Sequence, residues 1–507
     1  MKSSSLLRRP IVLVALLCAA LALPPLVTVL AQQGGSFDLS RNVIAGGGGT
    51  SGGGSLQISG TAGQSAAGTN MNGGTFTQVG GFWYTLGPTP TPQAGPGVFA
   101  FSNPSYSVAE GCVEAIITVN RTNGNTGAAS VDFATTNGTG YTPCNSVAGT
   151  AAQNCDFSYA TGTLNFANGD TSHTFSVLIS KTAYAEGPLA VNLALSNPTG
   201  GATLGAQSTD TLTINDDATI PTNSQPMDDA GTFVCQTYHD FLARQADPGG
   251  QTYWSGQITQ CAADQTCINN QRIAVSNAFF FELEYQQTGS YVYRLYRAAY
   301  GNNQPFPNPN SYPQDPTQPA KFPAYAVFLP DRAHLIGSSN LAADQLALAN
   351  LFVQRAAFQN KYPSNMSGSA FISAVLQTIQ TSDGADLSGQ SGNLLTVYNN
   401  AGGGTAGQGA VIYRLANNDN GGPNGGVNNQ PFIDAEYNRA FVTTQYFGYL
   451  RRDGDLGGLL FWLDQVNGAP LRDTTKQHAM VCSFITSNEY QNRFSAQVTH
   501  TNAECPQ

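Results

Sequence analysis

Carboxylates are the side chains of this 507-residue chain whose grouping could do chemistry. Acidic residues gather at the loops and at the end of the stretch from residue 97 to residue 218. Carboxylates that lie close together repel one another unless a cation offsets their charge. Calcium suits such a set, because it takes about six to eight oxygen ligands from carboxylates, backbone carbonyls and water. This stretch is therefore the first place to look for a metal site.

Signals of catalysis are weaker. The five histidines are scattered and form no H-E-x-x-H pattern, and the chain has neither a phosphate-binding loop nor a G-x-G-x-x-G before a helix. Residues 49–53 match the nucleophile-elbow pattern of hydrolases, but they lie in a glycine tract without the strand-to-helix context that the pattern needs. A pair of catalytic carboxylates, as in glycosidases, leaves no comparable signature in a sequence. We expect that the protein is not an enzyme.

The acidic loops separate short runs of residues with strand character. Several runs alternate apolar and polar side chains, as in Phe175, Val177 and Ile179. This period of two is typical of a sheet with one face on a core and the other in water. Clusters of Gly, Asn, Pro and Ser lie between the runs, so we predict a two-sheet β-sandwich. The seven runs are 98–102, 113–120, 130–135, 162–166, 173–180, 189–196 and 210–215.

The same stretch contains a series of motifs in a fixed order: Phe101, Tyr106-Ser-Val-Ala-Glu110, Asn120-Arg121, Val131-Asp-Phe133-Ala-Thr135, Cys155-Asp156-Phe157, Gly162-Thr-Leu-Asn-Phe166, Phe175-Ser-Val, Ala185-Glu186-Gly187, Leu195-Ser-Asn-Pro198 and Thr213-Ile-Asn-Asp216-Asp217. Over about 120 residues these motifs resemble a Calx-beta domain. The resemblance implies an all-β, immunoglobulin-like sandwich. It also implies calcium, since an acidic cluster at one end of the sandwich can bind calcium in that family.

The resemblance also indicates which acids would form the site, and two departures count against it. Lys181 and Thr182 replace acidic residues that are often found after the strand at 173–180. The acidic run that commonly ends the domain is cut short before Ala218. Two interpretations stay open: calcium binding, at one site rather than two, or a structural sandwich whose acids are solvated or cap turns. The candidate ligands are Glu110, Asp156, Glu186, Asp216 and Asp217.

Residues 1–31 are predicted to be an export signal. Three basic residues near the start are followed by an apolar core at 11–23 and a cleavage site at 29–31. The alternative is a retained membrane anchor, because the apolar stretch that ends at residue 31 is 22 residues long, although Pro24 and Pro25 interrupt it. We expect a secreted or cell-surface protein that meets the membrane only through export or such an anchor.

The charge balance restricts the class of partner. Without the signal, 18 basic and 31 acidic residues give a net charge of −13, and only 10% of all residues are charged. An acidic balance without a basic stripe argues against nucleic acid as a partner. We expect a protein or a glycan at the cell surface instead.

Cysteines support the same compartment. Eight remain after removal of the signal, and an even number in an exported chain favours disulfides. Cys112 and Cys235 are left for each other or free. A zinc site is the alternative, but no C-x-x-C pair or His/Cys cluster supports it. The candidate pairs are Cys144 with Cys155, Cys261 with Cys267, and Cys482 with Cys505.

Composition divides the rest of the chain. Residues 32–85 hold glycine-rich turns between three apolar-alternating pieces and are predicted to form a small β-meander. Residues 86–96 are a proline-rich linker, and residues 219–231 are a polar one. From residue 232 to residue 507 the spacing of apolar residues becomes helical. We therefore predict a multi-domain protein, with a β-sandwich followed by a mainly α-helical C-terminal region.

The helical region contains an internal repeat. A pattern that starts at Tyr238 recurs 208 residues later at Tyr446, with an Arg, an Asp, a Gly-Gly pair and a Trp at the same positions. Over 232–300 and 430–494 the region resembles the bacterial domain-of-unknown-function family 4214, which brings no molecular activity with it. Each copy is predicted to form a helix, an Asp/Gly turn, a helix with a buried Trp, and another helix.

The polar residues at the turns of the repeat have two interpretations. Asp453-Gly-Asp455 could ligate calcium, but it lacks the 12-residue loop with a distal bidentate Glu. Arg244 and Arg452 could contact a ligand. We favour structural roles, in which Asp and Gly make the turn, Arg pairs with a carboxylate and Trp fills the core.

Together these features predict an exported, non-enzymatic surface or extracellular protein. Its calcium-associated sandwich would serve adhesion, cell contact or rigid spacing. One alternative is an enzyme acting on extracellular polysaccharide, with two facing carboxylates in an aromatic-lined cleft within 232–494. Another is self-assembly through the helical repeats.

Overall fold

A computed structural model of the chain describes residues 94–137, 144, 149–216, 224–305, 321–417 and 426–505, and the backbone of six short strands between residues 33 and 78. The predicted export signal at 1–31, parts of the predicted linkers at 86–96 and 219–231, and Asp217 lie outside the described residues. In the described part, no helix has the length and apolar character needed to span a membrane. The chain divides into two units, residues 1–91 and residues 92–507.

The strands of the first unit pair two by two. The sequence predicted a single β-meander here, and the described strands instead form three separate antiparallel ladders. Glycine-rich strands offer few side chains that could pack neighbouring hairpins together. The ladders join β1 (Gln33–Gly34) with β2 (Phe37–Asp38), β3 (Gly48–Gly53) with β4 (Leu56–Thr61), and β5 (Met71–Gly73) with β6 (Phe76–Gln78).

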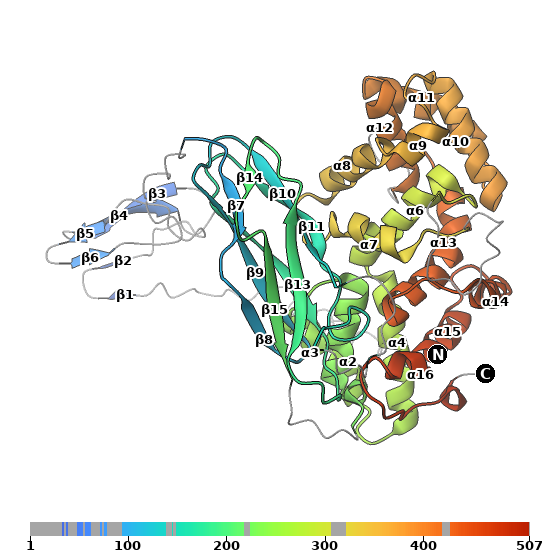
Figure 1. The fold of residues 1–507 in the computed structure, drawn as a ribbon, viewed down its shortest axis with the longest axis horizontal. Helices are drawn as coiled ribbons and strands as arrows, with labels where there is room; N and C mark the ends of the chain where they lie inside the picture. Colours follow the sequence, from blue (N-terminus) through green and yellow to red (C-terminus); the bar gives the residue numbers. More distant parts are fainter. Residues whose placement is uncertain are drawn as a thin grey trace, which may run out of the picture. The chain divides into compact units, whose positions relative to one another are not determined.

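The second unit begins with the predicted β-sandwich (Figure 1). One sheet has the strand order β11-β10-β13-β15-β8 and the other β12-β9-β7-β14. The sequence missed β8 and β14, which are short edge strands and pair parallel to β15 and β7. The strands are β7 (Val98–Phe101), β8 (Tyr106–Ala109), β9 (Val113–Thr122), β10 (Ala129–Thr135), β11 (Thr161–Phe166), β12 (Ser172–Ile179), β13 (Leu189–Ser196), β14 (Thr203–Leu204) and β15 (Thr209–Asn215).

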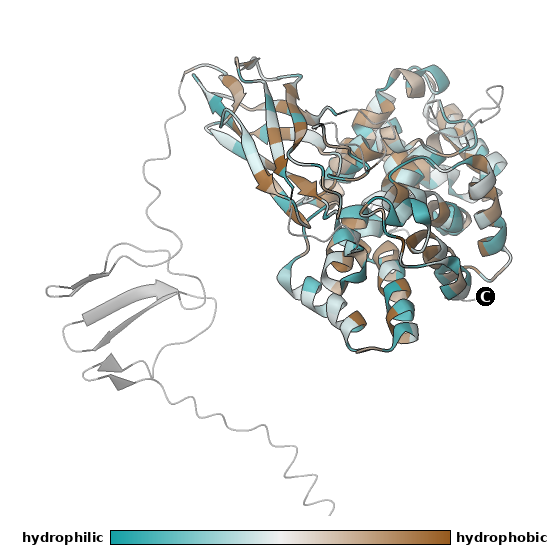
Figure 2. Ribbon diagram, turned by 60° about the horizontal axis from the view of Figure 1, so that its bottom comes forward, coloured by the Kyte–Doolittle hydropathy of each residue, from teal (hydrophilic) through white to brown (hydrophobic). Residues whose placement is uncertain are grey.

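Alternation along the strands builds the sandwich core. In β13 every second residue from Leu189 to Leu195 is buried, and the residues between them are not. Figure 2 shows this alternation as hydrophobic and hydrophilic stripes across the strands. In the neighbouring strand β15, buried residues lie opposite those of β13, as Leu212 does opposite Val191. Each such side chain contributes about 1.5–3 kcal/mol when it is fully buried.

The helical region follows and confirms the predicted order of domains. Its central helix, α6 (Gly289–Tyr300), is buried at all twelve positions, so the other helices pack around it on every side. The remaining helices are η1 (Pro226–Asp228), α2 (Ala230–Thr237), η2 (Tyr238–Leu242), α3 (Pro248–Thr259), α4 (Gln265–Phe281), α5 (Leu283–Gln287), α7 (Tyr325–Ala333), α8 (Leu341–Val353), α9 (Ala356–Lys361), α10 (Gly368–Asp383), η3 (Ser388–Gln390), α11 (Ser391–Asn400), α12 (Gly404–Ala416), α13 (Gln430–Gln445), η4 (Tyr446–Leu450), α14 (Leu456–Asn467), α15 (Thr474–Ile485), α16 (Asn488–Gln491) and η5 (Asn502–Glu504).

The connection between the first two helices has the same structure in both copies of the repeat. A π-helical turn, η2 or η4, ends the first helix, and an aspartate then caps the next one. The Asp247 carboxylate accepts from the Gly250 amide at 2.8 Å, and Asp455 accepts from Gly458 at 2.7 Å. A Cβ atom at Gly250 would lie 2.0 Å from the hydroxyl oxygen of Tyr238, so only glycine fits beneath that ring. The Asp/Gly turn is therefore structural.

The repeat arginines pair with carboxylates, as the structural interpretation predicted. Arg244 Nε donates to Glu284 at 2.9 Å, and Arg452 Nη2 donates to Glu489 at 2.8 Å. In Asp453-Gly-Asp455, the carboxylate of Asp453 also has a structural partner, because it accepts a hydrogen bond from the Tyr325 amide at 2.6 Å. The expectation of a buried Trp was too strong, since Trp254 and Trp462 are only half-buried against the core.

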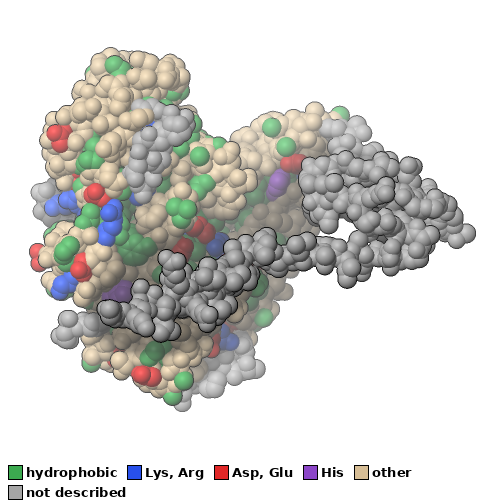
Figure 3. All heavy atoms as spheres, turned by 180° about the vertical axis from the view of Figure 1, so that it is seen from behind, with side chains coloured by type: hydrophobic (Ala, Val, Ile, Leu, Met, Phe, Trp, Pro, Cys, Tyr) green, Lys and Arg blue, Asp and Glu red, His purple; other side chains and the backbone are tan. Residues whose placement is uncertain are grey.

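Four disulfides join the eight cysteines. Three are the predicted pairs, Cys144–Cys155, Cys261–Cys267 and Cys482–Cys505. The fourth, Cys112–Cys235, links the turn between β8 and β9 to helix α2 and so ties the sandwich to the helical region. Charged side chains are few and scattered on the face drawn in Figure 3.

Candidate metal centre

The predicted acids lie at one end of the sandwich because the strands that carry them end there. Glu110 follows β8, and Asp216 follows β15, which runs parallel to β8 with Ala109 opposite Asn215. Asp156 lies in the loop before β11, where Phe157 bridges to Ile179 at the end of β12. Glu186 lies in the loop between β12 and β13. The sequence-predicted set therefore converges, apart from Asp217, which is outside the described residues.

Backbone amides orient three of these carboxylates. Glu110 Oε1 accepts from the Thr182 amide at 2.6 Å, and Asp156 Oδ2 accepts from the Ala152 amide at 2.6 Å. Asp216 Oδ2 accepts from the amides of Glu186 and the following glycine at 2.8 and 2.9 Å. The other oxygen of Asp156, Oδ1, is buried and has no hydrogen-bond partner. A buried acceptor without a partner is costly and points to a missing ligand.

The electrostatics show that the acids form one repelling set. Burial raises the pKa of Asp156 to about 7, with a further contribution from Glu110, although the Ala152 amide and Arg451 act against it. Burial also raises the pKa of Glu186 to about 8, and the charges of Asp156, Glu110 and Asp216 add to the effect. Carboxylates in such a set favour a bound cation, which would offset both the burial and the repulsion.

The comparisons with known proteins now identify this part of the chain. Residues 93–218 match the family model described as the Calx-beta domain. The sandwich is a Calx-beta domain. Residues 427–494, which hold the second copy of the helical repeat, match the domain of unknown function DUF4214.

The chain is also similar to parts of several solved structures. The apo-form Calx CBD1 domain is 27% identical, with 24% of this chain and 96% of that chain covered and a TM-score of 0.21. The calcium binding domain CBD12 of CALX1.1 is also 27% identical, with coverage of 24% and 45% and a TM-score of 0.21. The Calx CBD2 domain is 18% identical, with coverage of 25% and 92% and the same TM-score. No curated protein matches the chain.

The donor chemistry of the Calx-beta carboxylates fits a hard cation. They offer only oxygen, and the free Oδ1 of Asp156 supplies a ligand that nothing else in the protein occupies. Among the described residues, no three of these acids bring ligand oxygens within 4.8 Å of one another. The set would therefore need a small inward movement, or bridging waters and carbonyls, to complete a coordination shell.

The loop that carries Asp156 is held by a buried group of three charged residues, Arg451, Arg493 and Asp240. They were not among the residues predicted from the sequence. Arg451 Nη1 donates to the Gln153 and Phe157 carbonyls at 2.9 and 2.6 Å, and Arg493 Nε donates to the Asn154 carbonyl at 2.9 Å. Both guanidiniums also pair with Asp240, at 3.0 and 3.1 Å. Burial alone would raise the pKa of Asp240, but Arg493 and Arg451 hold it below the usual range.

The two copies of the repeat differ at two of these residues. Arg451 falls where the first copy has Ala243, and Asp240 falls where the second copy has Gly448. The copies also differ at other turn positions, such as Gln245 against Asp453 and Pro248 against Leu456, so this difference alone does not single out Arg451 and Asp240.

The loop that carries Glu186 is docked in the same way. The Ala183 amide donates to the Phe494 carbonyl at 2.7 Å, and the Tyr184 hydroxyl donates to the Asn492 carbonyl at 2.8 Å. Both acceptors follow helix α16 in the second repeat copy. Two of the acidic loops therefore rest directly on the helical region.

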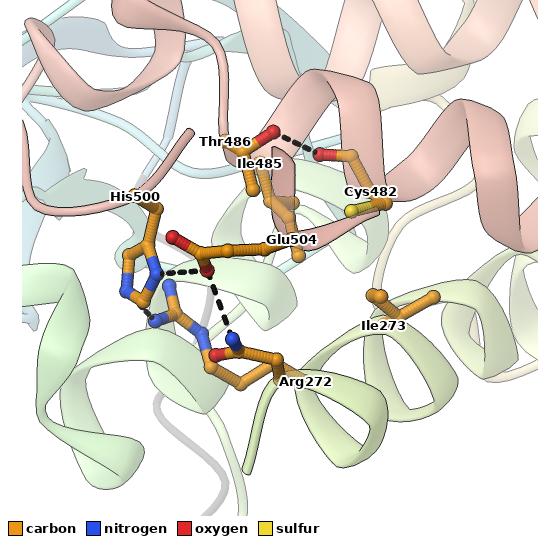
Figure 4. Close-up of a pocket in the computed structure, with 8 residues that line it drawn as sticks. Arg272, Ile273, Cys482, Ile485, Thr486, His500 and Glu504 are labelled. Carbon is orange, nitrogen blue, oxygen red and sulfur yellow. Dashed lines mark hydrogen bonds and ion pairs between the residues drawn. The ribbon is translucent and has the colours of Figure 1, made fainter. Parts of the chain in front are cut away.

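Two other groups of polar side chains among the described residues do not form comparable sites. Cys112 and Cys235 lie next to His239, but their sulfurs are joined in a disulfide and cannot ligate a metal as thiolates. Burial lowers the pKa of His239 to about 4, which keeps it neutral. The group in Figure 4, around His500 and Glu504, encloses about 10 Å³, which is room for one water.

Proposed function

We propose that the Calx-beta domain binds one calcium ion through Glu110, Asp156, Glu186 and Asp216. The observation that carries this proposal is the buried, unpartnered Oδ1 of Asp156, next to acids whose charges help to raise the pKa values of Asp156 and Glu186. The similar CBD12 structure is described as a calcium binding domain, which supports the same chemistry here.

Bound calcium would supply the positive charge that lets the buried Asp156 and Glu186 stay ionised beside the partly buried Glu110 and Asp216. The chain's own residues do the rest. The Thr182 and Ala152 amides each hold one oxygen of Glu110 and of Asp156 in place, and the second oxygen of Asp156 has no partner and would face the ion. Arg451 and Arg493 fix the loop of Asp156 on the helical region. Calcium would therefore stiffen the junction between the two domains.

We further propose that the protein is an exported, non-enzymatic spacer or adhesion protein of the cell surface, with a protein or glycan partner. Two buried helical acids have structural partners, because Glu436 pairs with Arg297 at 2.8 Å and Asp331 accepts from Arg355 Nη1 at 2.8 Å. Asp383 lies against Glu436, and burial together with that neighbour raises its pKa to about 7. Aromatic side chains of this region fill one shared core. A polysaccharide-degrading enzyme would instead need two facing acids in an open aromatic cleft, and turnover of polysaccharides by the purified protein would overturn this proposal.

Calcium should stabilise the protein measurably. At a calcium concentration of about 100 times the dissociation constant, binding adds about 2.7 kcal/mol to the free energy of unfolding. The measurement is thermal unfolding of the chain without its signal, in EDTA and then in millimolar calcium. The longer chain is needed because an isolated sandwich would lose Arg451, Arg493 and the bridge to Cys235.

Two variants make this test specific. Asp156→Asn keeps the shape of the side chain and should remove most of the calcium-dependent shift. Asp210→Asn is the matched control, because Asp210 lies near the other end of β15 and six residues from Asp216, or about 20 Å along a strand. Equal shifts in both variants would show that calcium acts elsewhere.

The affinity for calcium should rise with pH. In the folded protein the pKa values of Asp156 and Glu186 are raised to about 7 and 8, so these groups keep protons that the unfolded chain has lost above pH 4–5. Without calcium, Asp156 and Glu186 therefore make the free energy of unfolding fall as the pH rises from about 4 to 8. Binding should release protons near pH 7 and almost none at pH 9. Calorimetry in two buffers of different ionisation enthalpy measures the release, and binding without proton release at pH 7 would contradict the assignment.

A further inference from the structure

A groove is lined by residues of strand β11 and of helix α7, two elements that lie next to each other in Figure 1. It holds about 450 Å³ of space, which is within the range of small-ligand sites. Ser158, Thr161, Thr163 and Thr174 line its sandwich wall, and Leu329 and Arg332 line its helical wall. The Ser158 hydroxyl accepts from Arg451, and the Thr163 hydroxyl donates to Asp132. The groove is distinct from the acidic end of the sandwich.

Arg332 is the unusual residue of this groove. Its side chain is buried, with 5% of the residue exposed, and its guanidinium lies 5.3 Å from the centre of the Tyr285 ring. Nη2 donates to the Phe241 carbonyl, while Nε has no partner. Within the described part of the chain, no carboxylate lies within ion-pairing distance of it. A buried cation with unmet donors is costly unless an anion compensates it.

Other buried arginines of this protein have partners that compensate their charge. Arg451 and Arg493 share Asp240, and Arg297 pairs with Glu436. Arg121 has no carboxylate partner, but it donates to four backbone carbonyls. Arg332 has one such bond and a cavity beside it. The comparison points to a ligand anion as the missing partner.

The remaining groups of the groove restrict the ligand. Arg244 also lines it and pairs with Glu284, which acts on Arg332 as well, and Glu114 places one carboxylate among the lining residues, so Arg332 is the buried cation of the groove that has, among the described residues, no carboxylate in direct contact. The hydroxyl-rich sandwich wall suits a ligand with many hydroxyl groups. Phe133, stacked on Phe175 at 3.9 Å, adds an aromatic surface beside them. We propose that this groove binds a carboxylate-bearing saccharide, a uronic acid unit of a glycan, with its carboxylate on Arg332.

The test uses the chain without its signal and titrates it with galacturonate oligomers, with neutral galactose oligomers of the same length as the comparison. We expect saturable binding of the acidic oligomer only, and the same affinity in EDTA as in calcium, since Arg332 is not part of the calcium site. Arg332→Gln should weaken binding about ten- to hundred-fold, the value of a charge-assisted hydrogen bond. Arg472→Gln, at an exposed ion pair, should change nothing.

A second variant protects the test against misfolding of the first. Ala333→Trp, at the end of α7 in the groove wall, fills the space without touching the Arg332 charge and should block binding. Failure of millimolar galacturonate oligomers to bind, or unchanged binding in Arg332→Gln and Ala333→Trp, would overturn the proposal. Equal or tighter binding of an acidic peptide of Asp and Glu would overturn the saccharide assignment.

Discussion

Replacing Asp240 by asparagine is expected to lower the free energy of unfolding by about 3–5 kcal/mol. The side chain is 1% exposed and is the carboxylate that both Arg451 and Arg493 contact. Removing one partner of a buried ion pair leaves uncompensated charge, which costs more than the pair itself contributes. Urea unfolding should therefore show a lower midpoint with an unchanged slope.

Asp434→Asn is the control for this experiment. Asp434 pairs with Arg472 at 2.7 Å, but the two side chains are 36% and 51% exposed, so its loss should cost less than about 1 kcal/mol. The Asp240 variant should also reduce the calcium-dependent shift, because Arg451 and Arg493 hold the loop of Asp156. Losses of similar size in the two variants would show that the buried triad is not a main support of the junction.

The sandwich could be predicted from the sequence because its signal is local. Phe175, Val177 and Ile179 alternate within β12, and the structure buries all three in the same core. Strand β14 could not be found in this way, since Thr203 and Leu204 are both exposed and too few to show a period. Its parallel pairing with β7 depends on where the chain returns, which no local pattern encodes.

In the candidate site, too, some residues could be predicted from local sequence and others could not. The acids could be placed because the order of motifs resembles the Calx-beta family, in which acidic residues gather at one end of the sandwich. The contact of Arg451 with the Gln153 carbonyl joins residues 298 positions apart. No periodicity spans such a distance, and the two repeat copies differ at too many positions for their comparison to single out Arg451 and Asp240. By contrast, Arg244 and Glu284 pair within one repeat unit, so their role followed from the motif itself.

Replacing Cys112 and Cys235 together by serine is expected to cost about 2–5 kcal/mol of stability. Their disulfide spans 123 residues and joins the sandwich to helix α2, so it restricts the unfolded chain over a long loop. Urea unfolding of the oxidised protein and of the double variant measures the loss. Both cysteines are changed so that no free thiol can form a wrong bridge.

The pair Cys261 and Cys267 provides the matched comparison, because its disulfide closes only 6 residues. In the chain-entropy account the free energy from loop closure grows with the logarithm of loop length, so this double serine variant should lose about half as much as the long-loop variant. Glu110 lies two residues before Cys112, so loss of the long bridge should also weaken the calcium-dependent shift, while loss of the short one should leave it intact. Equal stability losses with an unchanged calcium response would mean that the two domains are held together by Asp240, Arg451 and Arg493 without help from the disulfide.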